Sequence, residues 1–307
     1  MAPMRYRAPV LDDAPAVLAV LAARETADVG TAIYRLEDLE EEWRGTELEL
    51  ARDAYVAEGE GGGIVAYVAV RRHGTLAAVA PDHEGRGIGA RLLEWAERRD
   101  RERGHPLHRQ WVAGPNASAR ALLTHAGYAR ARSYRRLVRP LDAVGPESPA
   151  PTTPGGVRLR PVDVARDALR LHALDAASFA DAPDYAPESP EMFRREHLEA
   201  HDFDAGLSLV AEVDGEPVAF LLARRRDEQE AGFVAILGVE PEHQRQGIGT
   251  ALLQHTFAGF AAAGLRQAQL MVASDNPRAL RVYERAGMAV QLQFDIYERP
   301  ADSSQRR

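Results

Sequence analysis

One stretch of this sequence occurs twice, and the second copy lies 160 positions after the first. Residues 79–93 and 239–253 share a valine, a proline, a histidine, two glycines, an isoleucine and two leucines in the same order. The match continues downstream, because Asn116 and Asn276 are separated by the same offset. A period of this length is too long for a solenoid of short repeats. The sequence therefore predicts a duplicated domain.

The length of 307 residues suits two domains of ordinary size. We expect an N-terminal domain over residues 3–142, a linker over 143–156 and a C-terminal domain over 157–301. The expected linker is rich in proline and glycine, so it has little capacity to form a core.

Composition excludes several classes of function. The net charge of −8 argues against broad nucleic-acid binding, which needs a basic surface. No apolar stretch is long enough to cross a membrane, and the N-terminus lacks the apolar core of a signal peptide. The chain has no cysteine, so it has no disulfide and no thiol nucleophile. The histidines show no metal-ligand spacing, and we expect a cytoplasmic protein without a metal.

The glycines of the second copy predict an anion site. The apolar run 233–239 is typical of a buried strand, and helical spacing of apolar residues begins just after Gly249. Backbone amides at such a helix start have no intrahelical partner, and Gly247 and Gly249 let an anion approach them closely. Arg245 can add a charge-assisted hydrogen bond. A tight turn without a ligand is the alternative. The chain has no lysine, so it has no P-loop of the usual nucleotide-binding type.

Two motifs carry a resemblance to a known family. Gln244-x-x-Gly247-x-Gly249, preceded by Val-x-Pro, resembles the coenzyme A loop of the GNAT family of N-acetyltransferases. The later run that contains Asn276 and Tyr283 resembles the last helix of that family. The resemblance covers nearly all of both halves. It implies an α/β (α+β) fold of two tandem GNAT (acyl-CoA N-acyltransferase) domains, each a mixed, mostly antiparallel, splayed sheet flanked by helices.

The resemblance also implies roles for residues of the second half. It gives acetyl-CoA as the cosubstrate and assigns its binding to Leu237, Val239, Gln244, Arg245, Gln246, Gly247, Ile248, Gly249, Thr250 and Asn276. Tyr283 would protonate the departing thiolate, and packing at helical spacing is the alternative for this tyrosine. Asn276 can act as a helix N-cap as well.

The general base is not evident from the sequence, because no carboxylate stands between Phe233 and Val239. Glu230, just before this strand, is the candidate that we name. Four aspartates in the region that lines the acceptor pocket of relatives are further candidates for the base: Asp181, Asp184, Asp202 and Asp204.

The first half departs from the family pattern. Glu84 stands where the second half has Gln244, and Leu123 stands where it has Tyr283. We expect this half to be degenerate and catalytically weak or silent. If it still holds coenzyme, the contacts would come from Val79, Gly85, Arg86, Gly87, Ile88, Gly89, Ala90 and Asn116.

The sequence therefore predicts an N-acetyltransferase that moves an acetyl group directly to a primary amine of a small molecule or peptide. A non-catalytic acyl-CoA-binding or regulatory module is the alternative. The tandem layout and the segments 283–288 and 297–300 resemble the mycothiol synthase group, which would imply a cysteinyl aminosugar as acceptor. We expect no nucleic-acid or membrane partner, and the oligomeric state stays open.

Overall fold

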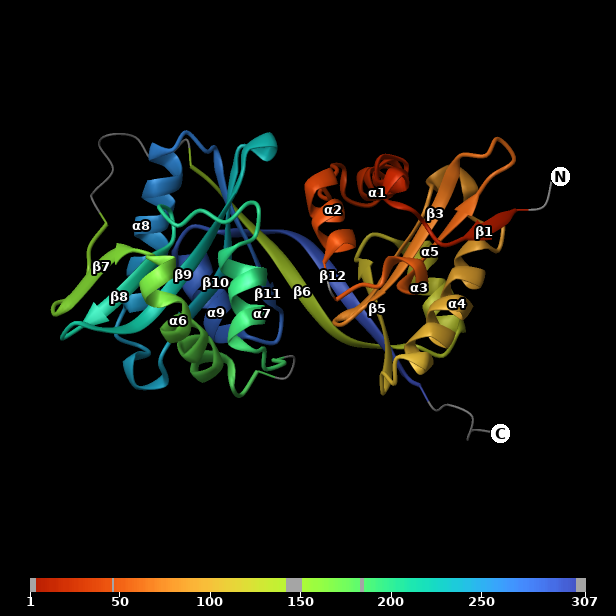
Figure 1. Ribbon diagram of the computed structural model, residues 1–307. Helices are drawn as coiled ribbons and strands as arrows, with labels where there is room; N and C mark the ends of the chain where they lie inside the picture. The colour runs from red at the N-terminus through yellow and green to blue at the C-terminus, as the bar shows by residue number, and fades with distance from the viewer. Residues whose placement is uncertain (1–3, 46, 142–150, 183–184, 302–307) are drawn as a thin grey trace. The chain divides into compact units, whose positions relative to one another are not determined.

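A computed structural model describes residues 4–45, 47–141, 151–182 and 185–301 of the chain (Figure 1). The chain divides into two compact units. The first comprises Met1–Tyr134 with Leu292–Arg307, and the second comprises Arg135–Gln291. Most of the expected linker, residues 143–150, lies outside the described residues.

The first half of the chain forms a series of strands and helices. In order, these are β1 (Arg5–Arg7), α1 (Ala14–Val29), α2 (Leu36–Arg44), α3 (Leu50–Asp53), β2 (Ala54–Glu58), β3 (Ile64–Arg71), β4 (Gly74–Val79), α4 (Ile88–Glu102), β5 (Leu107–Ala113), α5 (Ala117–His125) and β6 (Ala129–Pro140). A 3₁₀ turn, Pro81–His83, follows β4.

The second half repeats this order. Its elements are β7 (Val157–Pro161), α6 (Val164–Phe179), α7 (Pro190–Phe193), the π-helical turn η3 (Arg194–Leu198), β8 (Leu209–Val213), β9 (Glu216–Arg226), β10 (Ala231–Val239), α8 (Ile248–Ala262), β11 (Gln267–Ala273), α9 (Pro277–Arg285) and β12 (Ala289–Pro300). The 3₁₀ turn Pro241–His243 follows β10. The strands are mostly antiparallel, with one parallel pair in each half, so the expected fold is confirmed.

The last strand of each half does not stay with its own half. In the first unit the strand order is β1-β2-β3-β4-β5-β12, and residues 294–300 of β12 pair antiparallel with residues 107–113 of β5. In the second unit the order is β7-β8-β9-β10-β11-β6, so the end of β6 closes that sheet. The compact units therefore cross the boundaries that we expected at residues 142 and 157, because the two closing strands are exchanged.

Each sheet is covered on both faces, and this explains why its central strands are apolar throughout. In β3, Tyr67 and Ala69 pack with residues of α1 and α2, whereas Val68 and Val70 pack with residues of α4. In β9, Leu221 belongs to the cluster around α8, whereas its neighbours face α6 and α7. Strands buried on both faces lack the polar alternation of a half-exposed strand.

An arginine joins the first strand of each unit to the following helix and to the next strand. Arg7 Nε donates to Glu58 Oε1 at 2.5 Å, and its Nη2 donates to Asp13 Oδ1 at 2.9 Å. Arg160, Glu212 and Asp167 make the same contacts in the second unit, at 2.6 and 2.8 Å. This recurrence supports the duplication independently of the glycine loops.

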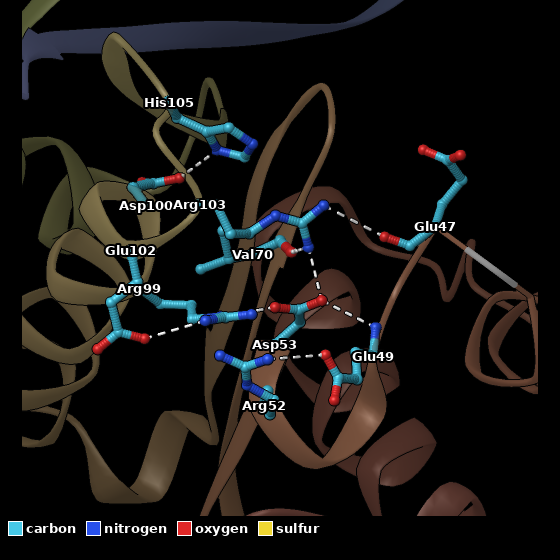
Figure 2. Close-up of polar contacts among 10 residues, drawn as sticks. All are labelled: Glu47, Glu49, Arg52, Asp53, Val70, Arg99, Asp100, Glu102, Arg103 and His105. Atoms are coloured by element: carbon cyan, nitrogen blue, oxygen red, sulfur yellow. Dashed lines mark hydrogen bonds and ion pairs between the residues drawn. The ribbon is translucent and has the colours of Figure 1, made fainter.

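A buried carboxylate anchors the end of α4 in the first unit (Figure 2). The Asp53 side chain is 3% exposed and accepts hydrogen bonds from Arg99 Nε at 2.7 Å and Arg103 Nη1 at 2.5 Å. The Glu49 amide donates to the same carboxylate at 2.8 Å. A buried charge is tolerated only when it is paired and hydrogen-bonded, and Asp53 meets both conditions. This cluster fixes α4, the helix that follows the first glycine loop.

Candidate active site

The glycine loop of the second unit forms the strand-to-helix turn that its sequence predicts. Gly247 is the N-cap of α8, with φ of 83°, a left-handed conformation that glycine adopts at little cost. Arg245 also has positive φ, 65°. The amides of Ile248, Gly249 and Thr250 begin the helix, where backbone donors have no intrahelical partner. The geometry therefore fits an anion at this helix start.

Side chains on both sides of the loop hold it in place. Gln244 Nε2 donates to the Val239 carbonyl at 3.1 Å, and Gln246 Nε2 donates to the Glu242 carbonyl at 3.1 Å. Arg278, in the first turn of α9, donates from Nη1 to Gln244 Oε1 at 2.8 Å. No motif in the sequence marks Arg278, and its position two residues after Asn276 is the one local signal for it. It brings a second guanidinium, beside that of Arg245, to the predicted phosphate site.

The strand that leads into this loop has one open edge. β10 pairs in parallel with β11 from Ala231 to Val234, whereas its antiparallel pairing with β9 continues to Val239. A bulge between Val234 and Ile236 marks the point of divergence. Leu237 and Val239, which the resemblance assigns to coenzyme binding, therefore lie where β10 has no paired β11 residue in the part of the chain that the structure describes.

Tyr283 lies on α9 and packs against the main core cluster of the second unit. Loss of hydration raises the pKa of its phenol to about 12. Among the described residues, none donates to or accepts from its hydroxyl group. A phenol of this kind stays protonated at neutral pH and is free to give its proton to a thiolate.

Asn276 performs the capping role that the sequence leaves open. Its side-chain oxygen accepts a hydrogen bond of 3.0 Å from the amide of Ala279. The same contact, at 2.8 Å, joins Asn116 to Ala119 in the first unit. These caps fix the start of α9 and α5.

The carboxylates considered as a base lie in different settings. Glu230 precedes β10, at the end of the strand opposite to the glycine loop, and is largely exposed. At about 3.3 Å per residue, roughly 20 Å separates its α-carbon from that of Leu237.

The four aspartates that the sequence leaves open differ in their surroundings. Asp181 is exposed, and Asp184 lies outside the described residues. Asp204 accepts from the Leu207 amide and shapes a turn. Asp202 is buried and lies 3.3 Å from Arg224 Nη1.

Asp175 is a further carboxylate that the sequence analysis missed. Burial raises its pKa to about 6, the negative charge of Glu188 adds to this rise, and a hydrogen bond from Tyr185 opposes it. Asp175 lies on α6, one turn before Ser178. A Cβ atom on Gly238 would lie 3.0 Å from Ser178 Oγ, so this helix turn packs directly on β10. No sequence signal marks Asp175, because burial alone distinguishes it from other helix aspartates.

The first unit keeps the loop geometry and changes its chemistry. Gly85 and Gly87 have φ of 71° and 77°, like Arg245 and Gly247 of the second unit. Glu84 forms an ion pair with Arg24 of α1 and accepts from Ser118 Oγ at 3.3 Å.

A cavity of about 490 Å³ lies beside this loop. Of the first-half residues named above as possible coenzyme contacts, all except Arg86 line this cavity. Leu123, at the position of the second unit's tyrosine, is part of the wall.

Comparisons with known proteins agree with this geometry. Residues 171–288 match the family described as "Acetyltransferase (GNAT) family", and residues 51–136 match "Acetyltransferase (GNAT) domain". A mycothiol acetyltransferase of Thermobispora bispora is 35% identical over 68% of this chain and 70% of the relative. That of Streptomyces avermitilis is 31% identical over 90% and 88%. The crystal structure of a GCN5-related N-acetyltransferase from Sphaerobacter thermophilus covers 97% of this chain and 96% of its own, with a TM-score of 0.81 and 26% identity.

The two folded units and the glycine loops define an acyltransferase that uses a coenzyme A thioester. The chain belongs to the GNAT family of acetyltransferases and is an N-acetyltransferase with acetyl-CoA as cosubstrate. A tandem GNAT protein of the clavulanic acid pathway, 17% identical with a TM-score of 0.77, has the same fold over 99% of this chain. No helix within the described residues is long and apolar enough to span a membrane.

Proposed function

We propose that the second unit carries the active site and transfers the acetyl group directly to a primary amine of a small molecule or peptide. The observation that carries this proposal is the open edge of β10 beyond Val234, which leads into the glycine loop. The first unit has leucine at the position of Tyr283 and a carboxylate at the position of Gln244. It therefore lacks both the acid and the neutral loop residue.

The reaction follows from these positions. The neutral amine attacks the thioester carbonyl carbon, and a C–N bond forms as the carbonyl oxygen becomes an oxyanion. An amide of β10 stabilises the oxyanion, an interaction typically worth about 3 kcal/mol of barrier. The C–S bond then breaks, and Tyr283 gives its proton to the departing thiolate. A base removes the proton that the amine nitrogen loses. Asp175 is our candidate for this base in place of the distant Glu230, because its raised pKa suits proton transfer near neutral pH.

The narrower candidate acceptor is a cysteinyl aminosugar. Its support is the set of relatives named mycothiol acetyltransferase, at 31–35% identity in the cases described above. These names belong to the relatives, so a primary amine in general is the broader proposal.

The test is release of free coenzyme A from acetyl-CoA by the purified chain, with a panel of primary amines that includes a cysteinyl aminosugar. Tyr283→Phe should lower kcat by about 10²–10⁴-fold and leave the Kd for acetyl-CoA unchanged. Tyr128→Phe, a matched change in the first unit, should leave kcat unchanged. Binding of acetyl-CoA without turnover on any amine would favour the non-catalytic module. Full activity of the Tyr283 variant would refute the proposed acid.

A further inference from the structure

The cavity of the first unit has room for a small molecule with an apolar body. It lies where β4 and β5, which pair only at Thr75 and Gln110, diverge. Its walls are largely aliphatic and include Leu21, Val68, Leu76, Ile88, Leu92 and Leu123. Its volume of about 490 Å³ is in the range of small-molecule sites.

The charged side chains of the lining favour a cation. Among the described residues, those that line the cavity include three carboxylates and one guanidinium: Glu25, Asp28, Glu84 and Arg24. With His83 neutral, this is an excess of two negative charges. Arg86 donates instead to the carbonyl of Asp82, at 3.0 Å. In the second unit, by contrast, the corresponding loop has the uncharged Gln244 with Arg278 bound to it. A pyrophosphate would be repelled where a cation would be attracted.

Asp28 is the carboxylate best placed to bind that cation. Arg24 Nη2 lies 2.7 Å from its Oδ1, and Asn116 Nδ2 donates to its Oδ2 at 2.9 Å. Burial nevertheless raises the pKa of Asp28, so these two partners do not fully offset the lost hydration. The hydrogen bond to Asp28 occupies the side-chain amide of Asn116, so this amide is not available to bind a pantetheine arm.

Gln110 supplies an unpaired hydrogen-bonding group inside the cavity. It is 5% exposed and lines the cavity, and its Nε2 has no partner among the described residues. Leu270 stands at the equivalent position of the second unit. Buried polar atoms are nearly always hydrogen-bonded, so an unpaired one beside a cavity indicates a ligand atom or a water. A ligand oxygen would satisfy this amide.

We propose that the cavity of the first unit binds an aliphatic amine rather than acetyl-CoA. The ammonium group lies at Asp28 and Glu84, the hydrocarbon part contacts the aliphatic walls, and an oxygen at the far end of the ligand accepts from Gln110. This site is additional to the acceptor site of the proposed function. The first unit is then a ligand-binding domain that kept the loop geometry of its family and lost the phosphate.

The test is calorimetric titration of the full chain, saturated with coenzyme A, which has no acetyl group to transfer, with four probes: octylamine, its hydroxyl-terminated analogue amino-octanol, octanol and octanoate. We expect both amines to bind at least about tenfold more tightly than octanol, because hydrogen bonds to charged groups are the stronger ones. Octanoate should not bind. Asp28→Asn and Glu84→Gln should each weaken amine binding severalfold without affecting octanol. Asp12→Asn, an exposed aspartate of the first unit that does not line the cavity, is the matched control.

Gln110→Leu tests the inner end of the cavity and copies the residue of the second unit. It should abolish the advantage of amino-octanol over octylamine and leave octylamine binding unchanged. Amine binding that is unaffected by both carboxylate variants would place the amine elsewhere and overturn the proposal. The proposal is also overturned if octanol binds as tightly as the amines, or if no probe binds. A separate titration with acetyl-CoA would overturn it if acetyl-CoA bound at two sites per chain and substitution of Gly87 removed one of them. None of these outcomes decides the catalytic test of the second unit, which depends on Tyr283 and not on this cavity.

Discussion

Arg278 and Gln244 form a hydrogen bond of 2.8 Å that joins the start of α9 to the glycine loop of the second unit. At the equivalent positions of the first unit, Ser118 donates to Glu84 at 3.3 Å. A contact between the same two positions occurs in both units, but its charge differs. In the second unit a positively charged guanidinium donates to a neutral amide, whereas in the first unit a neutral hydroxyl donates to a negatively charged carboxylate. This difference in charge favours an anion at the loop of the second unit and disfavours one at the loop of the first.

The first prediction concerns the guanidinium of this contact. Arg278→Ala should raise the Kd for acetyl-CoA about tenfold, because a charge-assisted hydrogen bond to phosphate is lost, and should change kcat little. Calorimetric titration at two salt concentrations measures the effect and its screening. Arg281→Ala, an exposed arginine one turn further along α9, is the control. An unchanged Kd for the Arg278 variant would show that its guanidinium does not reach the coenzyme.

The second prediction concerns the pH dependence of the proposed acid. Loss of hydration raises the pKa of Tyr283 to about 12, so the phenol stays protonated until the pH approaches that value. The pH profile of kcat should therefore show no fall caused by this group below about pH 11. A fall of kcat at lower pH that persists in the Tyr283→Phe variant belongs to another group. A fall that disappears in that variant would contradict the raised pKa.

The third prediction concerns the proposed base. A base must be deprotonated to act, and burial raises the pKa of Asp175 to about 6, so kcat/KM should fall as the pH drops below about 6. Asp175→Asn should lower kcat/KM by about 10²-fold or more and remove this acidic limb. Asp181→Asn is the control, since Asp181 is exposed in the same region. An acidic limb that survives in the Asp175 variant would assign the base elsewhere.

The fourth prediction concerns stability and the cluster of Figure 2. Asp53→Asn removes the buried anion that Arg99 and Arg103 share and leaves Arg99 with only the half-exposed Glu102, so unfolding of the first unit should become easier by about 3–5 kcal/mol. Arg52→Ala, which removes an exposed ion pair with Glu49, should cost at most about 1 kcal/mol. Denaturant unfolding followed by circular dichroism distinguishes the two. Equal effects of both variants would show that the buried pair contributes no more than a surface one.

Much of the fold was predictable because its signals are local. The glycine loop and the N-cap of Asn276 each depend on a few neighbouring residues, and both form as expected. The repeat with its two family motifs predicted an N-acetyltransferase that uses acetyl-CoA, and the family comparisons confirm this.

The sequence by itself determined the duplication, the two loops and the loss of Tyr283's counterpart at Leu123, because residue identity and spacing along the chain are enough for these. Only the tertiary structure decided which strand closes which sheet. β6 and β12 have similar patterns, and strand pairing depends on contacts between residues far apart in the chain. The raised pKa of Asp175, the approach of Arg278 to Gln244 and the unpaired amide of Gln110 likewise arise from burial and distance, which no local pattern encodes.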